Sequence, residues 1–292
     1  MLTPGRHQIE LDGVVQAYEV TGEGPVCFAH SGGPGVDSDN LRMPLVEQHL
    51  TMVYLDPIGT GESGLLPGGD YSVAEYARRL ELLRAHLDVT DGFLLGHSHG
   101  GFVALQHALD YPGRMRGLII YDSAPTWSRD LLDEARWRLT VMADRWADRP
   151  EVVAGVQAFL ASDDGEGDDV HDAPSLQEHF AKIRPLYFAD YRRTVNELGG
   201  PPKINISVYD PDRKPYEWDA RCQLGAITVP ALILVGTYDF ICPPVWARQI
   251  RAEMPNSRVV EFAESGHFLH VEEPGKFRDS VREFVAEVNR AR

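Results

Sequence analysis

The sequence predicts an α/β protein in which helices flank a mostly parallel, eight-stranded sheet, with a helical cap inserted into the chain. Apolar runs of strand length alternate with helical patterns before residue 125 and after residue 222. Between these two positions the strand-like runs stop and several helical patterns follow one another. We therefore expect a core from residues 1–124 and 223–292 and a cap from residues 125–222.

The predicted strands are short runs of apolar and β-branched residues bounded by turn residues. The first two are separated by Asp12-Gly13, a dipeptide typical of a hairpin. The later runs are continuously apolar, as expected for parallel strands buried on both faces. The eight expected strands are 8–11, 14–20, 26–29, 52–55, 93–95, 118–121, 231–235 and 258–262.

Helical spacing of apolar residues fills most of the segments between these strands. In the core we expect helices at 73–87, 102–109 and 245–253 and a terminal helix beginning near Pro274. In the cap we expect helices at 130–146, 151–161, 176–188 and 191–198.

Composition narrows the classes of partner. The chain has 292 residues, with 28 basic and 44 acidic side chains and a net charge of −16. This negative charge disfavours nucleic acid and anionic membrane surfaces as partners. The expected partner is a small-molecule substrate. Cys27, Cys222 and Cys242 lack metal-ligand or disulfide spacing, so we expect neither a metal site nor a disulfide framework. No cofactor is expected either. Residues 1–10 show no apolar leader, and a cytoplasmic location is expected. Nothing in the sequence assigns an oligomeric state.

A Gly-x-Ser-x-Gly pattern lies between the predicted strand 93–95 and the helix that follows it. In Gly96-His97-Ser98-His99-Gly100 the glycines permit a tight strand-to-helix turn that exposes the serine. Ser98 is the candidate nucleophile. The alternative is a glycine-rich turn in which the serine is incidental.

A serine nucleophile needs a base, and the base needs an acid that orients it. Asp239 follows the predicted strand 231–235, at the sheet edge where active-site residues collect, and is the candidate acid. The alternatives are that Asp239 caps a helix ahead of Pro243, or that Asp122, after strand 118–121, is the acid.

The candidate base is His267, which lies on a loop after the predicted strand 258–262. His270, His97 and His99 are other histidines near the same elements. The reaction also needs donors to an oxyanion, and the backbone N–H of His99 is the first candidate. The glycine-rich loop 30–35 is expected to supply the second.

Three motifs resemble the α/β-hydrolase superfamily and, within it, the prolyl aminopeptidase (proline iminopeptidase) family of serine peptidases. Ser-Gly-Gly-Pro-Gly at 31–35 is similar to that family's His-Gly-Gly-Pro-Gly, which implies the Gly33 N–H as an oxyanion donor. Asp-Pro-Ile-Gly-Thr-Gly-Glu-Ser at 56–63 resembles its Asp-Gln-Arg-Gly-x-Gly-x-Ser, and Gly-Thr-Tyr-Asp at 236–239 resembles its Gly-Glu-Tyr-Asp. The order serine, aspartate, histidine is that of the α/β-hydrolase architecture.

This chain departs from the family's pattern at Ser31, which stands in place of histidine, and at Pro57-Ile58, which stand in place of Gln-Arg. Two further departures concern the substrate's free amine. The peptidases carry a glutamate after the triad aspartate, where this chain has Phe240. They carry a second glutamate in a cap motif, Asn-Gly-Pro-x-Glu-Phe, whose nearest match at 199–204 has Lys203. An ammonium desolvated without a carboxylate partner is costly, so we expect an ester, lactone or blocked amide as substrate. Candidate pocket residues are Phe240, Lys203, Trp127, Trp137, Tyr187 and Phe188, although helical aromatics more often belong to a core.

Two other functions remain open at this point. A true prolyl aminopeptidase would need other cap carboxylates, such as Glu197 or Glu217, to hold the amine. A lyase, a cyclase or a binding protein on the same fold is a different class, because one fold hosts many chemistries.

Overall fold

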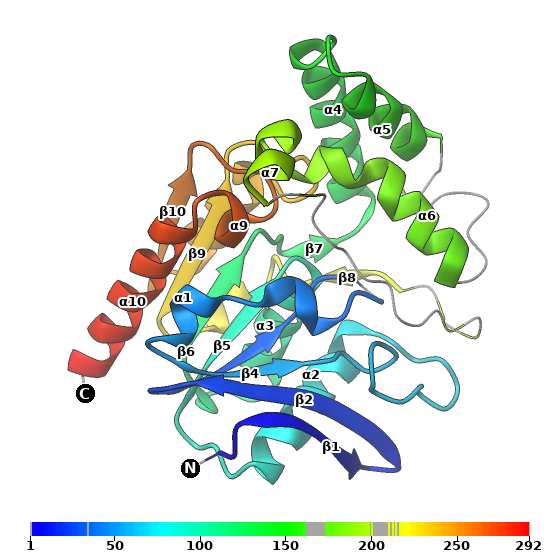
Figure 1. Cartoon of the computed structure of the whole chain (residues 1–292). Helices are drawn as coiled ribbons and strands as arrows, with labels where there is room; N and C mark the ends of the chain where they lie inside the picture. The colour runs from blue at the N-terminus through cyan, green and yellow to red at the C-terminus, as the bar shows by residue number, and fades with distance from the viewer. Residues whose placement is uncertain are drawn as a thin grey trace.

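A computed structural model describes residues 2–33, 35–161, 173–198, 200, 210, 212, 214 and 216–291 of the chain. In this part of the chain an eight-stranded sheet has the order β1-β2-β4-β3-β5-β6-β9-β10, and helices lie on both of its faces (Figure 1). The strands are β1 (Gly5–Leu11), β2 (Val14–Gly22), β3 (Val26–His30), β4 (Thr51–Leu55), β5 (Gly92–His97), β6 (Met115–Tyr121), β9 (Ala231–Gly236) and β10 (Ser257–Phe262).

The sheet is mostly parallel, as the sequence predicts. Strand β2 is antiparallel to β1 and β4, and the remaining neighbours are parallel. In the register, His97 lies opposite Tyr121 and Gly236 opposite Phe262. The carboxyl ends of β5, β6, β9 and β10 therefore meet at one edge, which brings together loops that are far apart in the sequence.

The central strands alternate their side chains between two apolar layers. Leu94, for example, packs in the layer with α2, α3 and α8, whereas Phe93 and Leu95 pack in the layer with α1 and α10. Both faces are thus covered, which is why the strand sequences are continuously apolar. The core helices are α1 (Pro44–Glu47), α2 (Val73–His86), α3 (His99–Asp110), α8 (Pro244–Glu253), α9 (Leu269–Glu272) and α10 (Pro274–Arg290), with 3₁₀ turns η1 (Ser38–Leu41) and η3 (Leu224–Ala226).

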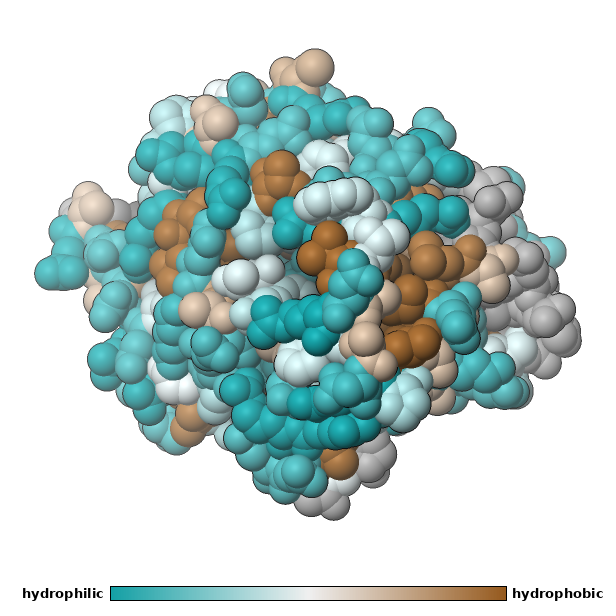
Figure 2. Space-filling model, turned by 90° about the horizontal axis from the view of Figure 1, so that it is seen from above, coloured by the Kyte–Doolittle hydropathy of each residue, from teal (hydrophilic) through white to brown (hydrophobic). Residues whose placement is uncertain are grey.

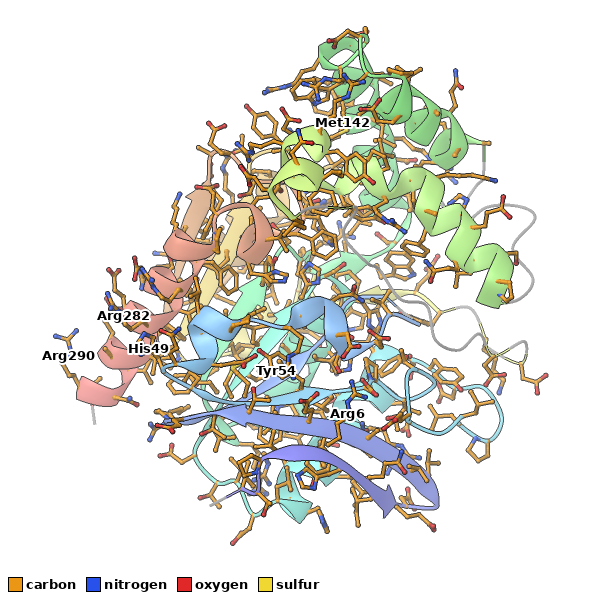
Figure 3. All side chains as sticks on the ribbon, in the orientation of Figure 1. Arg6, His49, Tyr54, Met142, Arg282 and Arg290 are labelled. Atoms are coloured by element: carbon orange, nitrogen blue, oxygen red, sulfur yellow. The ribbon has the colours of Figure 1, made fainter. Side chains whose placement is uncertain are left out.

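Between β6 and β9 the chain forms further helices, at the top of the view in Figure 1. Met142, labelled in Figure 3, belongs to an apolar cluster of this segment, while Tyr54 belongs to the sheet below it. We call residues 125–222 the cap segment. Its elements are β7 (Thr126–Trp127), α4 (Arg129–Arg145), α5 (Pro150–Leu160), α6 (Ala173–Ile183), η2 (Arg184–Tyr187), α7 (Tyr191–Leu198) and β8 (Trp218–Asp219).

One predicted helix of the cap segment is divided in the structure. The sequence predicts a single helix over 176–188, but α6 ends at Ile183 and the chain continues as the 3₁₀ turn η2. Pro185 explains the break, because its ring has no N–H to donate and clashes with the preceding helical turn. After this turn the backbone at Phe188 is extended, with φ −119° and ψ 144°.

Hydrophilic side chains cover much of the face seen in Figure 2. Figure 2 looks down on the end that carries the cap segment and shows apolar patches separated by hydrophilic side chains. In the ranges described, no helix combines the length and apolar character that crossing a bilayer requires. The large hydrophobic side chains exposed in the described part of the chain are Leu65, Trp137, Val141, Leu160, Leu198 and Val245.

Candidate active site

Ser98 occupies a strained turn between β5 and α3. Its φ is +54° and its ψ −120°, a conformation that non-glycine residues rarely adopt. The turn requires its two glycines: a Cβ on Gly96 would lie 2.1 Å from the carbonyl oxygen of Gly100, and one on Gly100 would lie 2.2 Å from that of His30. Ser98 is partly exposed on this turn, whereas its neighbours His97 and His99 are buried.

His267 and Asp239 form a buried hydrogen-bonded pair. The Nδ1 atom of His267 donates to Oδ2 of Asp239 at 2.7 Å, and the two residues are 3% and 1% exposed. The other carboxylate oxygen, Oδ1, accepts the backbone N–H groups of Ile241 and Cys242, each at 3.0 Å. With its proton on Nδ1, the imidazole has Nε2 available as a base.

His97 joins the serine turn to the histidine loop. Its Nε2 donates to the backbone carbonyl of His267 at 2.9 Å, and the two ring centroids are 4.6 Å apart. Burial lowers the pKa of His97 well below its usual value, so the ring is a neutral donor. This places the His267 loop beside the residue that precedes Ser98. From the sequence, His97 is only a histidine that flanks Ser98, because nothing local to 96–100 shows what its ring contacts.

The glycine-rich loop after β3 lies against the serine. A Cβ on Gly32 would be 3.0 Å from Cβ of Ser98, and the next residue, Gly33, has φ +120°. The hydroxyl of Ser31 donates to the carbonyl of Val36 at 2.8 Å and closes the loop. Pro34 lies outside the described residues. Because the first N–H groups of a helix have no intrahelical acceptor, His99, the first residue of α3, offers its N–H next to Ser98.

Asp122, the competing acid, has another role in the structure. Its Oδ1 accepts the N–H of Gly236 at 2.8 Å, directly beneath the loop that carries Asp239. Burial, and then the charge of Asp239, raise the pKa of Asp122 well above its usual range, which favours the neutral form of this carboxyl. The hydrogen bond from His267 goes to Asp239 instead.

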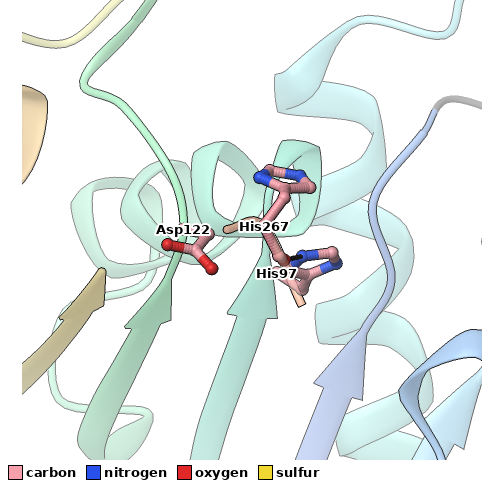
Figure 4. Close-up of side chains that lie close together, drawn as sticks. All are labelled: His97, Asp122 and His267. Atoms are coloured by element: carbon pink, nitrogen blue, oxygen red, sulfur yellow. Dashed lines mark hydrogen bonds between the residues drawn. The ribbon is translucent and has the colours of Figure 1, made fainter. Parts of the chain in front are cut away.

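His97, Asp122 and His267 lie close together, with one potential ligand atom of each within 4.8 Å of the others (Figure 4). Each of these side chains has a hydrogen-bond partner within the protein: the His267 carbonyl, the Gly236 N–H and the Asp239 carboxylate, respectively. Among the described residues, the other carboxyl oxygen of Asp122, Oδ2, is buried without a hydrogen-bond partner.

His270, the histidine nearest to His267 in the sequence, is structural. Its Nδ1 is hydrogen-bonded to the hydroxyl of Tyr121 at 2.7 Å, and its Nε2 lies 3.0 Å from the carbonyl of Asn40. Burial lowers its pKa to about 4. Both ring nitrogens are engaged in tying α9 to β6 and η1.

The predicted pocket residues divide into two groups. Phe240 is 1% exposed and packs against the rings of Phe159 and Tyr187, each with centroids 5.3 Å away. The Tyr187 ring also lies 5.4 Å from the His267 ring. Phe188 stacks on Phe268 at 5.3 Å. These aromatic side chains form an apolar wall between the cap segment and the His267 loop.

Trp127 and Trp137 lie elsewhere. Trp127, on β7, packs on Phe102 of α3 and is paired with Trp218 of β8. Trp137 is 57% exposed on α4 beneath the guanidinium of Arg138, because it lies on the face of α4 opposite to the buried Ala135 and Leu139. The expectation that Trp137 lines the pocket is therefore not supported by this placement. Lys203 lies outside the described residues.

One contact near the serine was missed by sequence reasoning. Nε2 of His99 is hydrogen-bonded to the hydroxyl of Tyr216 at 2.6 Å, 117 residues away in the chain. This contact joins the end of the cap segment to the residue after Ser98. No local pattern around Tyr216 signals it.

This architecture and these motifs match a known family. The model of the alpha/beta hydrolase fold family matches residues 24–274. The chain belongs to the α/β-hydrolase family. Among curated proteins, a proline iminopeptidase of Saccharolobus solfataricus is 28% identical over 286 residues, covering 93% of this chain and 88% of the relative.

Solved structures of this family support the same fold. An alpha/beta fold family hydrolase of Bacillus anthracis has a TM-score of 0.70 and 22% identity, covering 96% of this chain and 98% of that one. A thermophilic esterase of Thermogutta terrifontis has a TM-score of 0.66 and 24% identity, covering 97% and 98%. The protein is an α/β-fold hydrolase with proline iminopeptidase-like relatives.

Proposed function

We propose that this α/β hydrolase is a serine hydrolase that cleaves an ester, a lactone or an amide of a small molecule through Ser98, His267 and Asp239. The observation that carries the proposal is the 2.7 Å hydrogen bond between His267 and Asp239, buried at the sheet edge where Ser98 stands on its strained turn. A histidine with its proton held on Nδ1 is oriented to accept the Ser98 proton on Nε2.

The reaction would proceed in two halves. Ser98 Oγ attacks the carbonyl carbon while His267 Nε2 takes its proton, and the N–H groups of His99 and Gly33 stabilise the tetrahedral oxyanion. The intermediate collapses as His267 returns the proton to the leaving group, which leaves an acyl group on Ser98. Water, deprotonated by the same histidine, then releases the acid and restores the serine.

The apolar wall supports a substrate without a free ammonium next to the scissile bond. The position after Asp239 holds Phe240, which is 1% exposed and enclosed by aromatic rings, so it offers no charge to a cation. Desolvating an ammonium against such a surface costs several kcal/mol. We therefore favour a neutral acyl group.

The second candidate is a prolyl aminopeptidase, favoured by the Saccharolobus solfataricus relative. It would need cap carboxylates in place of the missing glutamates. Glu197 is 61% exposed, and Glu217 is exposed as well, so neither is enclosed near the aromatic wall. This placement weighs against the second candidate.

The test compares kcat/KM of the wild type on a matched pair of substrates, a short-chain aryl ester or lactone and a free-amine prolyl arylamide. We expect turnover of the ester or lactone, little of the prolyl amide, and loss of activity in Ser98→Ala. A clear preference for the prolyl amide would establish the second candidate. Full ester turnover by Ser98→Ala would refute a serine mechanism.

A further inference from the structure

Glu272, the last residue of α9, carries a carboxylate that is buried at the junction of the histidine loop and the cap segment. Its side chain is 0% exposed, and the cation facing it, Arg193 of α7, is 4.0 Å away. Burial raises the pKa of Glu272 to about 7, against the lowering effect of backbone N–H donors. A buried carboxylate at this position is costly to maintain, which calls for a reason for its presence.

The two oxygens of this carboxylate bind two segments that are far apart in the sequence. Oε2 accepts the N–H of Gly266, the residue before His267, at 2.7 Å. Oε1 accepts the N–H of Ala189, between η2 and α7 of the cap segment, at 2.9 Å. One side chain thus connects the loop of the proposed base to the part of the cap segment that carries Tyr187 and Phe188.

The same two segments touch directly. The N–H of His267 donates to the carbonyl of Tyr187 at 2.7 Å, and a Cβ on Gly266 would lie 2.5 Å from that carbonyl oxygen. Arg193 donates to the carbonyl of Glu264 at 3.0 Å. The backbone of the cap segment is therefore held against the backbone of the histidine loop, with glycine required at the contact.

The neighbouring carboxylate provides a comparison. Oε2 of Glu273 accepts the hydroxyl of Ser265 at 2.7 Å and the N–H of Glu264 at 3.1 Å, so these bonds stay within the histidine loop. Both glutamates support the loop, but the hydrogen bonds of Glu272 extend to the cap segment as well.

We propose that Glu272 is a positioning residue that couples residues 187–190 of the cap segment to the His267 loop, so that the aromatic wall and the proposed base are placed together. The role in turnover rests on the proposed function; the coupling itself does not. Gln at this position has one acceptor oxygen and one NH₂ group, so it can accept from only one of the two N–H donors.

The experiment measures amide hydrogen exchange and turnover in the wild type, Glu272→Gln and the matched control Glu273→Gln. In Glu272→Gln we expect exchange to accelerate by about 10-fold in the peptides covering both 186–190 and 264–268, because the amide keeps only one of the two N–H donors and the link between the segments is lost. In Glu273→Gln the one amide oxygen can still accept from both the Ser265 hydroxyl and the Glu264 N–H, so exchange is expected to stay close to the wild type in both peptides. The proposed coupling is overturned if hydrogen exchange in Glu272→Gln is unchanged, or if it accelerates only in the peptide that covers 264–268.

Turnover of the ester then tests the positioning role. We expect kcat of Glu272→Gln to fall by about 10-fold with KM changed less, and kcat of Glu273→Gln to stay within about three-fold of the wild type. Accelerated exchange with unchanged kcat would make Glu272 purely structural. If Glu272→Gln does not fold, Glu272→Asp, whose shorter side chain cannot reach both donors, takes its place. A wild type without Ser98-dependent turnover refutes the proposed function, while the exchange data still decide the coupling.

Discussion

Replacing Asp239 by asparagine tests how His267 is held. The Oδ1 of Asp239 faces two donors, the N–H groups of Ile241 and Cys242, and Oδ2 faces His267 Nδ1. An asparagine must turn its carbonyl oxygen to the two backbone donors, because an NH₂ group would confront them. Its NH₂ group then faces Nδ1 of His267, which can only accept from it.

This hydrogen bond reverses the tautomer of the imidazole. The proton then resides on Nε2, the nitrogen that would take the proton of Ser98, so the base is blocked while the residues keep their shape. We expect kcat of Asp239→Asn to fall by roughly 10⁴-fold. This is the loss of kcat that a wrong histidine tautomer causes in a serine, histidine and aspartate triad. We expect KM to change by less than about three-fold, since the substrate contacts remain.

The assay is steady-state hydrolysis of the aryl ester at neutral pH, with thermal unfolding as a check on folding. Asp122→Asn is the matched control. Burial and the neighbouring Asp239 raise the pKa of Asp122 well above its usual range, which favours the neutral form that an amide imitates. We expect this control to keep kcat within about 10-fold of the wild type. Two results would refute the assignment of Asp239 as the acid. One is a loss of kcat in Asp122→Asn as large as that in Asp239→Asn, and the other is a kcat of Asp239→Asn within about 10-fold of the wild type.

Three further outcomes follow from named contacts. Gly100→Ala places a Cβ 2.2 Å from the carbonyl of His30, so we expect a lower melting temperature and loss of ester turnover. Trp137→Ser alters a side chain that is 57% exposed and should leave kcat/KM within about two-fold of the wild type; a larger loss would place Trp137 at the substrate. Burial alone would raise the pKa of Glu81, but hydrogen bonds, led by that from Arg84, lower it to about 2. The ionised Glu81 carboxylate therefore stabilises the fold fully above pH 4.5, and this stabilisation is lost as the pH falls toward 2. In urea unfolding at pH 7 we expect Glu81→Gln to be less stable than the wild type by about 1–2 kcal/mol, after allowance for solvent screening. The difference should shrink in acid.

The fold was predictable because its signals are local. The central parallel strands are recognisable as apolar runs, since strands covered on both faces need apolar side chains at nearly every position. The exposed edge strand β1 is instead recognisable from the Asp12-Gly13 turn that joins it to β2. The division of the helix predicted over 176–188 was missed, although Pro185 signals it. The short pairing of β7 with β8 was also missed, because two-residue strands 92 positions apart leave no periodicity to detect.

The candidate site was only partly accessible to the same reasoning. Sequence reasoning selected Asp239 and His267 because each follows a strand, and the structure brings them to 2.7 Å. It did not find Glu272, whose partner Ala189 lies 83 residues away. Trp137 is 57% exposed on α4, and the helical pattern of α4 alone does not say which face another helix covers.

By itself, the sequence determined the order of strands and helices, the glycine turn around Ser98 and the chain order of the candidate triad. The strands, helices and turn could be read locally because the backbone conformation and burial of a short segment depend on neighbouring residues. The tertiary structure decided which carboxylate meets His267, which aromatic residues enclose Phe240 and which segments Glu272 joins. These depend on the register of parallel strands and on the packing of the cap segment against the sheet edge. Such contacts arise between residues separated by tens to hundreds of positions, and no local pattern encodes their distances.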